Sequence, residues 1–478
     1  MIHSVIKKNI NNNLFKVISK CADENGIECY LIGGYVRDLI IGSKKPKDVD
    51  IMVIGDGIEI AKKVCKNLNP KTKIKIYKNF GTAAFKYKNF DIEFVGARKE
   101  SYKNSSRNPT VKIGTLNDDL NRRDFTINSI AIGLNSSNWG KILDKFKGLN
   151  DIENKLIKTP LDPVKTFSDD PLRMLRGIRF SCQLDEFNLH PDLLNTISLE
   201  KNRINIISGE RISEELNKIL LTDKPSIGFK ILDETGLLKI ILPELTALKG
   251  IDEIEGCKHK DNFYHTLEVL DNICLTTNNL WLRWSAILHD IGKAPTKEFI
   301  NKIGWTFHGH ELKGSKMVYK IFKRLHLPLN NKLKYVQKII YMSSRPIILS
   351  NDYISDSAVR RLIYDANEDV DDLLTLCEAD ITTKNPNRFK KYLNNFKKVR
   401  KKIVEVEKRD HIRNFQSPIT GRKIMETFNL KPCKSIGKIK EAIKEAILEG
   451  EIKNDYNAAY KLMLEEGKKL GLIANEKR

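Results

Sequence analysis

Short apolar runs separated by turn residues predict a mixture of strands and helices in the first 150 residues. Residues 28–32 (ECYLI) form an apolar run that ends at Gly33-Gly34, and residues 49–54 (VDIMVI) form a β-branched run that ends at a glycine-rich turn. Residues 35–41 predict a short helix, and the amphipathic start of the chain predicts one helix rather than a secretory signal. Three more strands are predicted at residues 73–77, 83–87 and 90–95.

The hydrophobic period changes to about 3.6 residues after residue 150, which is typical of helices. The predicted fold class is therefore α+β, with a mixed N-terminal part followed by an all-α part. The clearest helices are expected at residues 171–183, 211–221, 227–235 and 266–275. Near the C-terminus, a basic helix is expected at residues 438–449, after a turn at Gly437.

Composition narrows the class of protein. The chain has 478 residues, of which 41% are hydrophobic and 30% charged, so it has the apolar content that a disordered chain lacks. At roughly 150 residues per domain, this length suggests about three domains. No run approaches the roughly 18 apolar residues of a membrane span. The eight cysteines include no CxxC spacing, so we expect a protein of the reducing cytoplasm without a disulfide framework, zinc knuckle or membrane partner.

The formal net charge of +22, from 83 Lys and Arg against 61 Asp and Glu, favours a polyanionic partner. Because phosphate contacts dominate affinity for nucleic acids, a nucleic acid is the first candidate. Composition drift in the coding sequence is the alternative, since Lys, Asn and Ile are all abundant.

A pair of carboxylates is the sharpest chemical signal in the sequence. Asp48 and Asp50 open a strand, and alternation places both on one face, roughly 6.6 Å apart along the strand. Carboxylates at this spacing suit a pair of divalent metal ions, and Glu93 in a later strand offers a third ligand. The preceding Gly33-Gly34 turn opens a helix whose N-terminus suits phosphate. Solvated carboxylates at a strand start are the alternative.

A second charged cluster, Arg122-Arg123-Asp124, suits a nucleoside triphosphate. Two guanidiniums offer several donors to phosphate oxygens, and an adjacent carboxylate accepts from ribose hydroxyls. A surface cluster of ion pairs is the alternative. Further along, Asp170 and Arg173 flank the start of an amphipathic helix, where a simple helix cap with a solvated arginine is the alternative to a binding role.

Taken in order, the motifs GGYVRD, DVD, RRDFTINSIAI and DDPLRMLRGIRF resemble the class II CCA-adding tRNA nucleotidyltransferases and their bacterial poly(A) polymerase relatives. The resemblance covers most of residues 28–220 and implies a polymerase-β-like head. It implies that Asp48 and Asp50 bind catalytic Mg²⁺, and that Asp170 and Arg173 read the incoming base. With Glu93 as the third catalytic carboxylate, the nucleotide-binding residues expected are Gly33, Gly34, Arg37, Arg122, Arg123, Asp124, Asp170, Arg173, Arg176 and Arg179.

Histidine and aspartate residues form another set in FYHTLEVL, WSAILHDIGK, FHGHE and CEADITTK. Such side chains suit divalent transition metals. This set resembles the HD-domain metal-dependent phosphohydrolases, a resemblance that implies metal ligation by His265, His289, Asp290 and Asp380. His310 is expected to lie nearby, and His308 is either part of the set or a bystander. The alternative is a decayed HD fold that only binds tRNA.

Two basic segments are expected to contact the RNA backbone. Arg173, Arg176 and Arg179 follow one another at helical spacing and predict a basic stripe. Residues 384–413 contain 12 Lys and Arg against 3 Asp and Glu, and a solvated surface is the alternative there. The lysines expected to bind RNA are Lys397, Lys398, Lys401 and Lys402.

These observations predict a cytoplasmic enzyme that adds CCA to the 3′ end of tRNA from CTP and ATP, with an HD phosphohydrolase activity in addition. A poly(A) polymerase or a partial CCA-adding enzyme shares every motif of the head. An HD phosphohydrolase with a head that only binds nucleotide is the alternative of another class. The expected domains are a head (1–150), a helical neck (151–240), an HD domain (241–395) and a basic helical tail (396–478).

Overall fold

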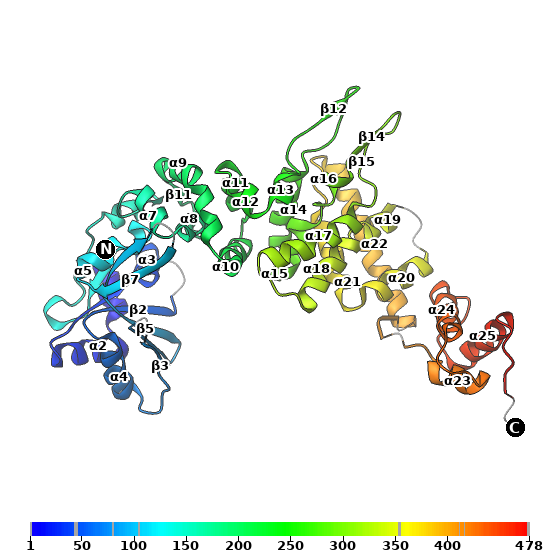
Figure 1. Cartoon of the computed structure of the whole chain (residues 1–478), viewed down its shortest axis with the longest axis horizontal. Helices are drawn as coiled ribbons and strands as arrows, with labels where there is room; N and C mark the ends of the chain where they lie inside the picture. The colour runs from blue at the N-terminus through cyan, green and yellow to red at the C-terminus, as the bar shows by residue number, and fades with distance from the viewer. Residues whose placement is uncertain are drawn as a thin grey trace. The chain divides into compact units, whose positions relative to one another are not determined.

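The computed structural model describes residues 2–42, 46–78, 81–103, 106–351, 355–410, 412–414 and 416–475. The chain forms two compact units, residues 1–241 and 242–478 (Figure 1). The first unit combines a sheet with helices and the second is almost wholly helical, as the α+β prediction requires. In the part of the chain that is described, no helix is both long and apolar enough to cross a membrane. The eight cysteines are free thiols.

A mixed sheet of seven strands forms the centre of the first unit, in the order β3-β4-β5-β2-β1-β8-β9. Strands β2 and β5 run parallel, because the chain between them passes through helix α4 (Gly57–Leu68), and the other neighbours in this sheet are antiparallel. The strands are β1 (Glu28–Ile32), β2 (Asp48–Ile54), β3 (Lys75–Tyr77), β4 (Thr82–Tyr87), β5 (Phe90–Gly96), β8 (Ala131–Gly133) and β9 (Ile142–Leu143).

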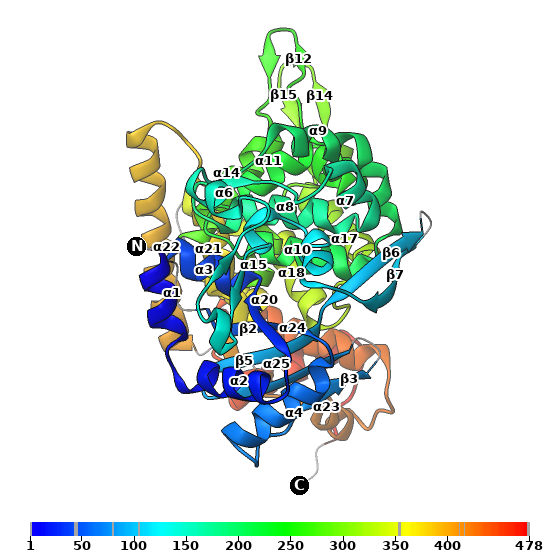
Figure 2. The ribbon, with the colours of Figure 1, turned by 90° about the vertical axis from the view of Figure 1, so that its left-hand side faces the viewer.

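Helices α2 (Asn13–Glu24) and α4 cover one side of this sheet (Figure 2). Along β2, Val49, Ile51 and Val53 are fully buried, whereas Asp48 is exposed and Asp50 is half-buried. The alternation that the sequence predicts is therefore present, and it leaves the carboxylates on the open face of the strand.

The N-terminal stretch departs from prediction, because it forms two helices, α1 (Ile2–Ile10) and α2, instead of one. Asn12 interrupts the helix: its side chain accepts hydrogen bonds from the backbone N–H groups of Leu14 and Phe15, which is the geometry of an N-cap. The sequence also gave no sign of β8, β9 or the separate hairpin of β6 (Arg98–Lys103) and β7 (Ser106–Ile113), which pair outside or at the edge of the main sheet.

The rest of the first unit is helical and follows the sheet. Helices α8 and α10 pack together, and α11 packs on α8. The helices predicted at residues 35–41, 171–183, 211–221 and 227–235 lie within a few residues of α3 (Gly34–Ile41), α8 (Leu172–Gln183), α10 (Gly209–Leu220) and α11 (Ser226–Glu234). The other helices of this unit are α5 (Leu116–Asn121), α6 (Gly148–Glu153), α7 (Pro163–Asp169), α9 (Pro191–Glu200) and α12 (Leu237–Ile241).

Helices α14, α15, α17, α18 and α21 form the core of the second unit, and two hairpins extend from it (Figure 1). One hairpin pairs β12 (Glu253–Ile254) with β13 (Cys257–Lys258), and the other pairs β14 (Glu298–Ile300) with β15 (Gly304–Thr306). The long basic helix α22 packs on α19 and α20. The helices are α13 (Pro243–Thr246), α14 (Asn262–Cys274), α15 (Leu280–Leu288), α16 (Lys293–Thr296), α17 (His310–Arg324), α18 (Asn331–Met342), α19 (Arg345–Asn351), α20 (Asp356–Ala366), α21 (Val370–Ala379), α22 (Pro386–Asp410), α23 (Gly421–Phe428), α24 (Lys434–Glu449) and α25 (Tyr456–Lys469).

Two of the expected domain boundaries coincide with helices: position 150/151 lies inside α6, and position 395/396 lies inside α22. The division into domains stays a prediction. Gly437, expected to form a turn before a basic helix, lies inside α24. A glycine within a helix costs only about 1 kcal/mol relative to alanine, so favourable packing of the helix outweighs it.

Candidate active site and candidate metal centre

Three carboxylates from two neighbouring strands face one cleft in the first unit. Asp48 and Asp50 lie on β2, and Glu93 on β5 is the register partner of Asp50. All three line a cleft of roughly 480 Å³, together with lysines of β3 and β4. The structure therefore brings together the three carboxylates that the sequence analysis grouped.

The charges in this cleft repel one another. Burial raises the pKa of Asp50 and the charge of Asp48 adds to the rise, while Arg123 opposes it. Burial also raises the pKa of Glu93, with a contribution from Asp50 that Arg98 opposes. A bound divalent cation would relieve this repulsion, so the donor set fits the metal site that the sequence predicts.

Gly33 lies directly against Asp50 and Arg123. Its φ of +74° is in the left-handed region, and a Cβ atom there would lie 3.1 Å from Asp50 Oδ2 and 3.5 Å from Arg123 Nη1. Gly33 also precedes the first residue of α3, and no side chain caps that helix. The phosphate turn, a carboxylate and a guanidinium thus meet within a few ångströms, as a triphosphate site requires.

Asp119, which the sequence analysis did not select, lies between the two predicted phosphate-binding arginines. It is 1% exposed and accepts from Nε and Nη2 of Arg122 at 2.8 and 2.6 Å and from the same atoms of Arg123 at 3.1 and 3.0 Å. Burial acts to raise the pKa of Asp119, but Arg123 and Arg122 outweigh it and hold the pKa below its usual value. The neighbouring Leu120 packs with apolar residues of β1 and β2, so the arginines project from a fixed base.

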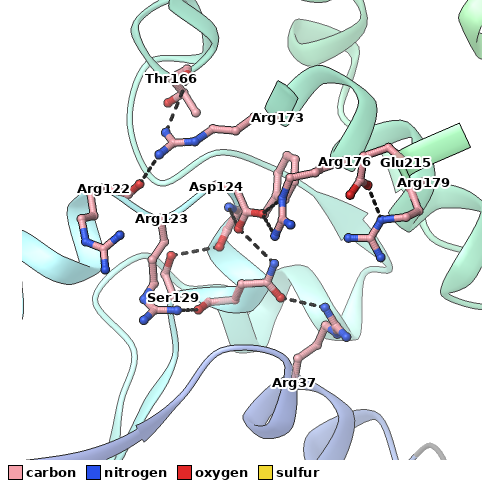
Figure 3. Close-up of polar contacts among 12 residues, drawn as sticks. Arg37, Arg122, Arg123, Asp124, Ser129, Thr166, Arg173, Arg176, Arg179 and Glu215 are labelled. Atoms are coloured by element: carbon pink, nitrogen blue, oxygen red, sulfur yellow. Dashed lines mark hydrogen bonds and ion pairs between the residues drawn. The ribbon is translucent and has the colours of Figure 1, made fainter. Parts of the chain in front are cut away.

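Asp124 forms hydrogen bonds with other residues of the protein. Its Oδ2 accepts from Nε and Nη2 of Arg176 at 2.8 and 2.6 Å, and its Oδ1 accepts from Asn128 Nδ2 at 3.0 Å (Figure 3). Burial acts to raise the pKa of Asp124, yet Arg176 and these hydrogen bonds hold it far below its usual value. Asp124 therefore remains an anion, and it ties the turn after α5 to helix α8.

Arg37 is also used internally. Only 5% of the residue is exposed, its Nη1 donates to Asn128 Oδ1 at 2.8 Å, and its Nε donates to Asp38 at 2.8 Å. Its guanidinium lies 4.9 Å from the centre of the Phe180 ring. In this geometry, Arg37 positions α3 through Asn128, and direct binding of nucleotide by Arg37 stays a prediction.

The basic stripe predicted along α8 is not an open surface. Arg173 and Arg179 are each 8% exposed. Arg173 Nη2 donates to the Arg122 carbonyl at 2.6 Å, and Arg179 Nε donates to Glu215 at 2.6 Å (Figure 3). The buried carboxylate of Glu215 on α10 neutralises Arg179 in this structure, and the contact of Arg179 with RNA phosphates stays a prediction. Asp170 is half-buried and caps α8 through the Leu172 N–H.

The second unit brings the predicted histidines and aspartates together. One ligand atom from each of His265, His289 and Asp290 lies within 4.8 Å of the others. Asp380 joins them, since its Oδ1 is 2.8 Å from His265 Nε2 and 3.8 Å from His289 Nε2. These residues come from α14, the end of α15 and the end of α21, three helices that pack on one another.

The chemistry of these donors fits a divalent cation. His289 Nδ1 faces the Ala286 carbonyl at 2.7 Å, so that nitrogen donates and Nε2 carries the lone pair. That Nε2 is buried and has no hydrogen-bond partner, which is costly unless an ion binds it. Burial acts to raise the pKa of Asp290, but His289, Lys293 and His265 together hold it well below its usual value. Asp290 is thus held in the anionic form that binds metal.

Gly292 brings a further histidine to this cluster. A Cβ atom at Gly292 would lie 2.0 Å from the His310 carbonyl oxygen, so only glycine permits this approach of α17. His310 Nε2 lies 3.9 Å from Asp290 Oδ1, whereas His308 is exposed. His310 is therefore part of the cluster, and His308 is the bystander of the two.

The four lysines expected to bind RNA lie on α22. Lys397, Lys398 and Lys401 are exposed, whereas Lys402 lies 2.5 Å from Asp356 of α20. Three exposed lysines along one helix are compatible with RNA binding, and Lys402 instead helps to fix the helix in place.

Comparisons with known proteins place these two sites in recognised domains. The sequence matches the poly A polymerase head domain over residues 29–158, the probable RNA and SrmB-binding site of polymerase A over residues 186–249, and the HD domain over residues 262–384. Nucleotidyltransferase and HD domains generally use divalent metals, in agreement with both donor sets.

Relatives extend the likeness over most of the chain. The multifunctional CCA protein of Pseudomonas fluorescens is 30% identical over 313 residues, which are 63% of this chain and 71% of the relative. That of Psychromonas ingrahamii is 29% identical over 383 residues, 77% and 83% of the two chains. The crystal structure of the Bacillus stearothermophilus CCA-adding enzyme in complex with CTP shares the fold, with a TM-score of 0.67, 20% identity and coverage of 96% and 99%.

We predict that Gly33→Ala weakens binding of MgATP about tenfold. The new methyl group would contact Asp50. In addition, the alanine would have to adopt a left-handed backbone conformation, which costs roughly 1–2 kcal/mol. Gly42→Ala is the matched control, because Gly42 ends the same helix with φ +76° and has no atom within 4 Å of its Cβ position. Isothermal titration calorimetry and thermal unfolding separate the two effects: both variants lose stability, but only Gly33→Ala loses affinity. Equal affinities for the two variants would contradict the proposed contact.

We predict that the purified protein carries a divalent transition metal that Asp290→Asn removes almost completely. The substitution keeps the size of the side chain but removes the charge that balances the cation. His308→Ala, which changes an exposed histidine outside the cluster, should retain the metal. Elemental analysis by inductively coupled plasma mass spectrometry measures both, and an equal metal content in the two variants would refute the site.

Proposed function

This chain belongs to the family of multifunctional CCA proteins, and we propose that it adds CMP, CMP and AMP to the 3′ end of tRNA from CTP and ATP. The observation that supports this proposal best is the convergence of Asp48, Asp50 and Glu93 in one cleft, with the Gly33 turn and Arg123 at its edge. This arrangement suits the transfer of a nucleotidyl group, because it places metal ligands beside donors for a leaving pyrophosphate.

In the proposed reaction, each side chain of the head has a distinct task. Bound Mg²⁺ would make the attacking 3′-hydroxyl more acidic and stabilise charge on the leaving pyrophosphate. Asp48, Asp50 and Glu93 would hold these ions, while Arg122 and Arg123 bind the triphosphate. Asp119 keeps both guanidiniums aimed and leaves them 23% and 15% exposed. Preorganised charges of this kind need no rearrangement when charge develops.

We propose the same order of domains as the sequence indicates, with a head, a neck, an HD domain and a tail. We propose boundaries after α6 and after α22, where these two helices end. The exposed lysines 397, 398 and 401 would then contact tRNA from the helix that leads to the tail.

The HD cluster supports a second function, a metal-dependent phosphohydrolase. One observation favours this function: the buried Nε2 of His289 has no hydrogen-bond partner and lies near the carboxylates of Asp290 and Asp380. A bound transition metal would supply an activated water molecule to attack a phosphoester. His310, with its Nε2 facing Asp290, would orient the phosphate.

The decisive test of nucleotide addition uses tRNA that lacks its 3′ CCA, labelled CTP and ATP, and Mg²⁺. We expect sequenced products to end in CCA, and Asp50→Asn to reduce the rate at least a thousandfold with tRNA binding retained. Products that carry only A residues would identify a poly(A) polymerase or an A-adding enzyme instead. His308→Ala serves as the control that leaves the head unchanged.

A second prediction concerns base selection without a template. C and A both present an amino donor beside a ring-nitrogen acceptor, which complements one carboxylate and one guanidinium, here Asp170 and Arg173. Arg173→Ala should therefore lower the rates with CTP and ATP. It should also reduce the preference for CTP and ATP over UTP and GTP about tenfold, since unmet polar groups cost about 1–3 kcal/mol. Single-nucleotide kinetics with all four triphosphates measure this. Asp50→Asn should lose activity equally with all four triphosphates. Unchanged selectivity in Arg173→Ala would mean that other residues read the base.

A further inference from the structure

Helix α17 of the second unit carries a row of lysines along its exposed side. This lysine row consists of Lys313, Lys316, Lys320 and Lys323. The four residues follow one another at intervals of three, four and three positions, so they share one face of the helix. All four are exposed, and the row extends over about 15 Å of the helix axis. It therefore forms a continuous line of positive charge on the surface.

No acid of the protein neutralises this charge. In the part of the chain that the structure describes, none of the four lysines forms an ion pair. On α22, by contrast, Arg400 lies 2.7 Å from Glu378, and Lys402 lies 2.5 Å from Asp356. Like charges three and four residues apart repel one another on a helix, and a line of phosphate groups would relieve that repulsion.

The lysine row ends beside a cavity with an aromatic wall. Helix α18 packs on both α17 and α15 (Figure 1). Near the end of α17, the ring of Phe322 lies 6.0 Å from the ring of Trp281 at the start of α15. Trp281 and Tyr335 of α18 line a cavity of roughly 580 Å³. A chain bound along the lysine row would thus reach two aromatic side chains.

The side chains of this cavity differ in how firmly they are held. The Tyr335 hydroxyl donates to Asp372 at 2.6 Å, which fixes the ring in the wall. Trp281 is half-buried and lines the cavity, so its indole is accessible to a ligand. Nucleic-acid bases stack on such rings with little dependence on sequence.

The charge of the cavity continues that of the lysine row. Lys332 and Lys334 line it, are exposed and form no ion pair with any described residue. Lys338 and Asp369, also in the lining, pair with each other. Glu368 is the remaining acid of the lining, so the unpaired cations outnumber the unpaired anion.

This surface is distinct from the HD cluster. Trp281 precedes His289 by eight residues along α15, which places the two about 12 Å apart along the helix axis. The cavity therefore opens at the end of α15 that lies away from the metal ligands.

We propose that the lysine row and the Trp281 cavity bind an RNA strand, with phosphates along α17 and one unstacked base against Trp281. The identity of this RNA as tRNA rests on the proposed function. The proposal gives the second unit an RNA-binding surface apart from the exposed lysines of α22, and it assigns a base contact as well as backbone contacts.

The test measures affinity of the full-length protein for tRNA that lacks its 3′ CCA, over a series of salt concentrations. Lys316→Ala/Lys320→Ala should reduce the slope of log K against log salt by about 1.4–1.8, since each phosphate contact contributes about 0.7–0.9. Lys62→Ala/Lys66→Ala is the matched control, because it removes two exposed lysines, also four residues apart, from α4 of the first unit. The control should keep the slope of the parent, as should Lys316→Arg/Lys320→Arg.

Stacking predicts a different signature for the tryptophan. Trp281→Leu should weaken tRNA binding at least fivefold at every salt concentration with the slope unchanged, because stacking releases no counterions. Trp281→Phe, which keeps a ring, should restore most of the affinity. Thermal unfolding of each variant confirms that the fold is intact.

An unchanged slope in Lys316→Ala/Lys320→Ala would overturn the proposal, as would an equal loss of slope in the Lys62/Lys66 control. Unchanged affinity in Trp281→Leu would overturn the base contact. Vesicles that contain phosphatidylserine form a second arm: binding to them that depends on the lysine row, with no effect on tRNA, would assign the surface to a membrane instead. Nucleotide addition is scored separately. Addition of CCA with an unchanged slope refutes only the RNA surface, and a reduced slope without nucleotide addition refutes only the proposed function.

Discussion

The head depends on one electrostatic constraint: its partly buried guanidiniums must be paired within the protein when no ligand is bound. An unpaired buried charge costs several kcal/mol, so each guanidinium needs an acid or a carbonyl group. Asp119 pairs with Arg122 and Arg123, Asp124 pairs with Arg176, and Glu215 pairs with Arg179. These pairs connect α5, α8 and α10, so the charges that prepare the site also hold the first unit together.

The two candidate sites hold their carboxylates in different electrostatic surroundings. In the head, like charges crowd at Asp50 and Glu93, and the pKa of each is raised. In the HD cluster, histidines and Lys293 lower the pKa of Asp290, and the buried Nε2 of His289 has no hydrogen-bond partner. Carboxylates alone suit a hard cation bound by oxygen, whereas mixed nitrogen and oxygen donors suit a transition metal.

Much of this was predictable from local pattern. The strand that carries Asp48 and Asp50 and the glycine turn before it follow from the local sequence pattern, whereas the set of His265, His289, Asp290 and Asp380 follows from the resemblance to HD-domain phosphohydrolases. Asp119 was missed because it precedes Arg122 and Arg123 by three and four residues, a helical spacing that also describes many ordinary surface pairs. The burial of Arg179 was not predictable either, because its partner Glu215 lies 36 residues away on another helix.

The same limit applies to continuity between domains. Domain boundaries were expected at 150/151, where the hydrophobic period changes, and at 395/396, but α6 and α22 run through these positions, since a helix ends where its packing and caps end.

The hydrogen bond from Arg173 to the Arg122 carbonyl joins the helix expected to read the base to the turn expected to grip the triphosphate. If Arg173 reads the base and Arg122 binds the triphosphate as proposed, a nucleotide that displaced Arg173 would also disturb the backbone that aims Arg122. Fidelity would then be expressed in turnover more than in occupancy, because a mismatched base in the cleft would misalign its own phosphates.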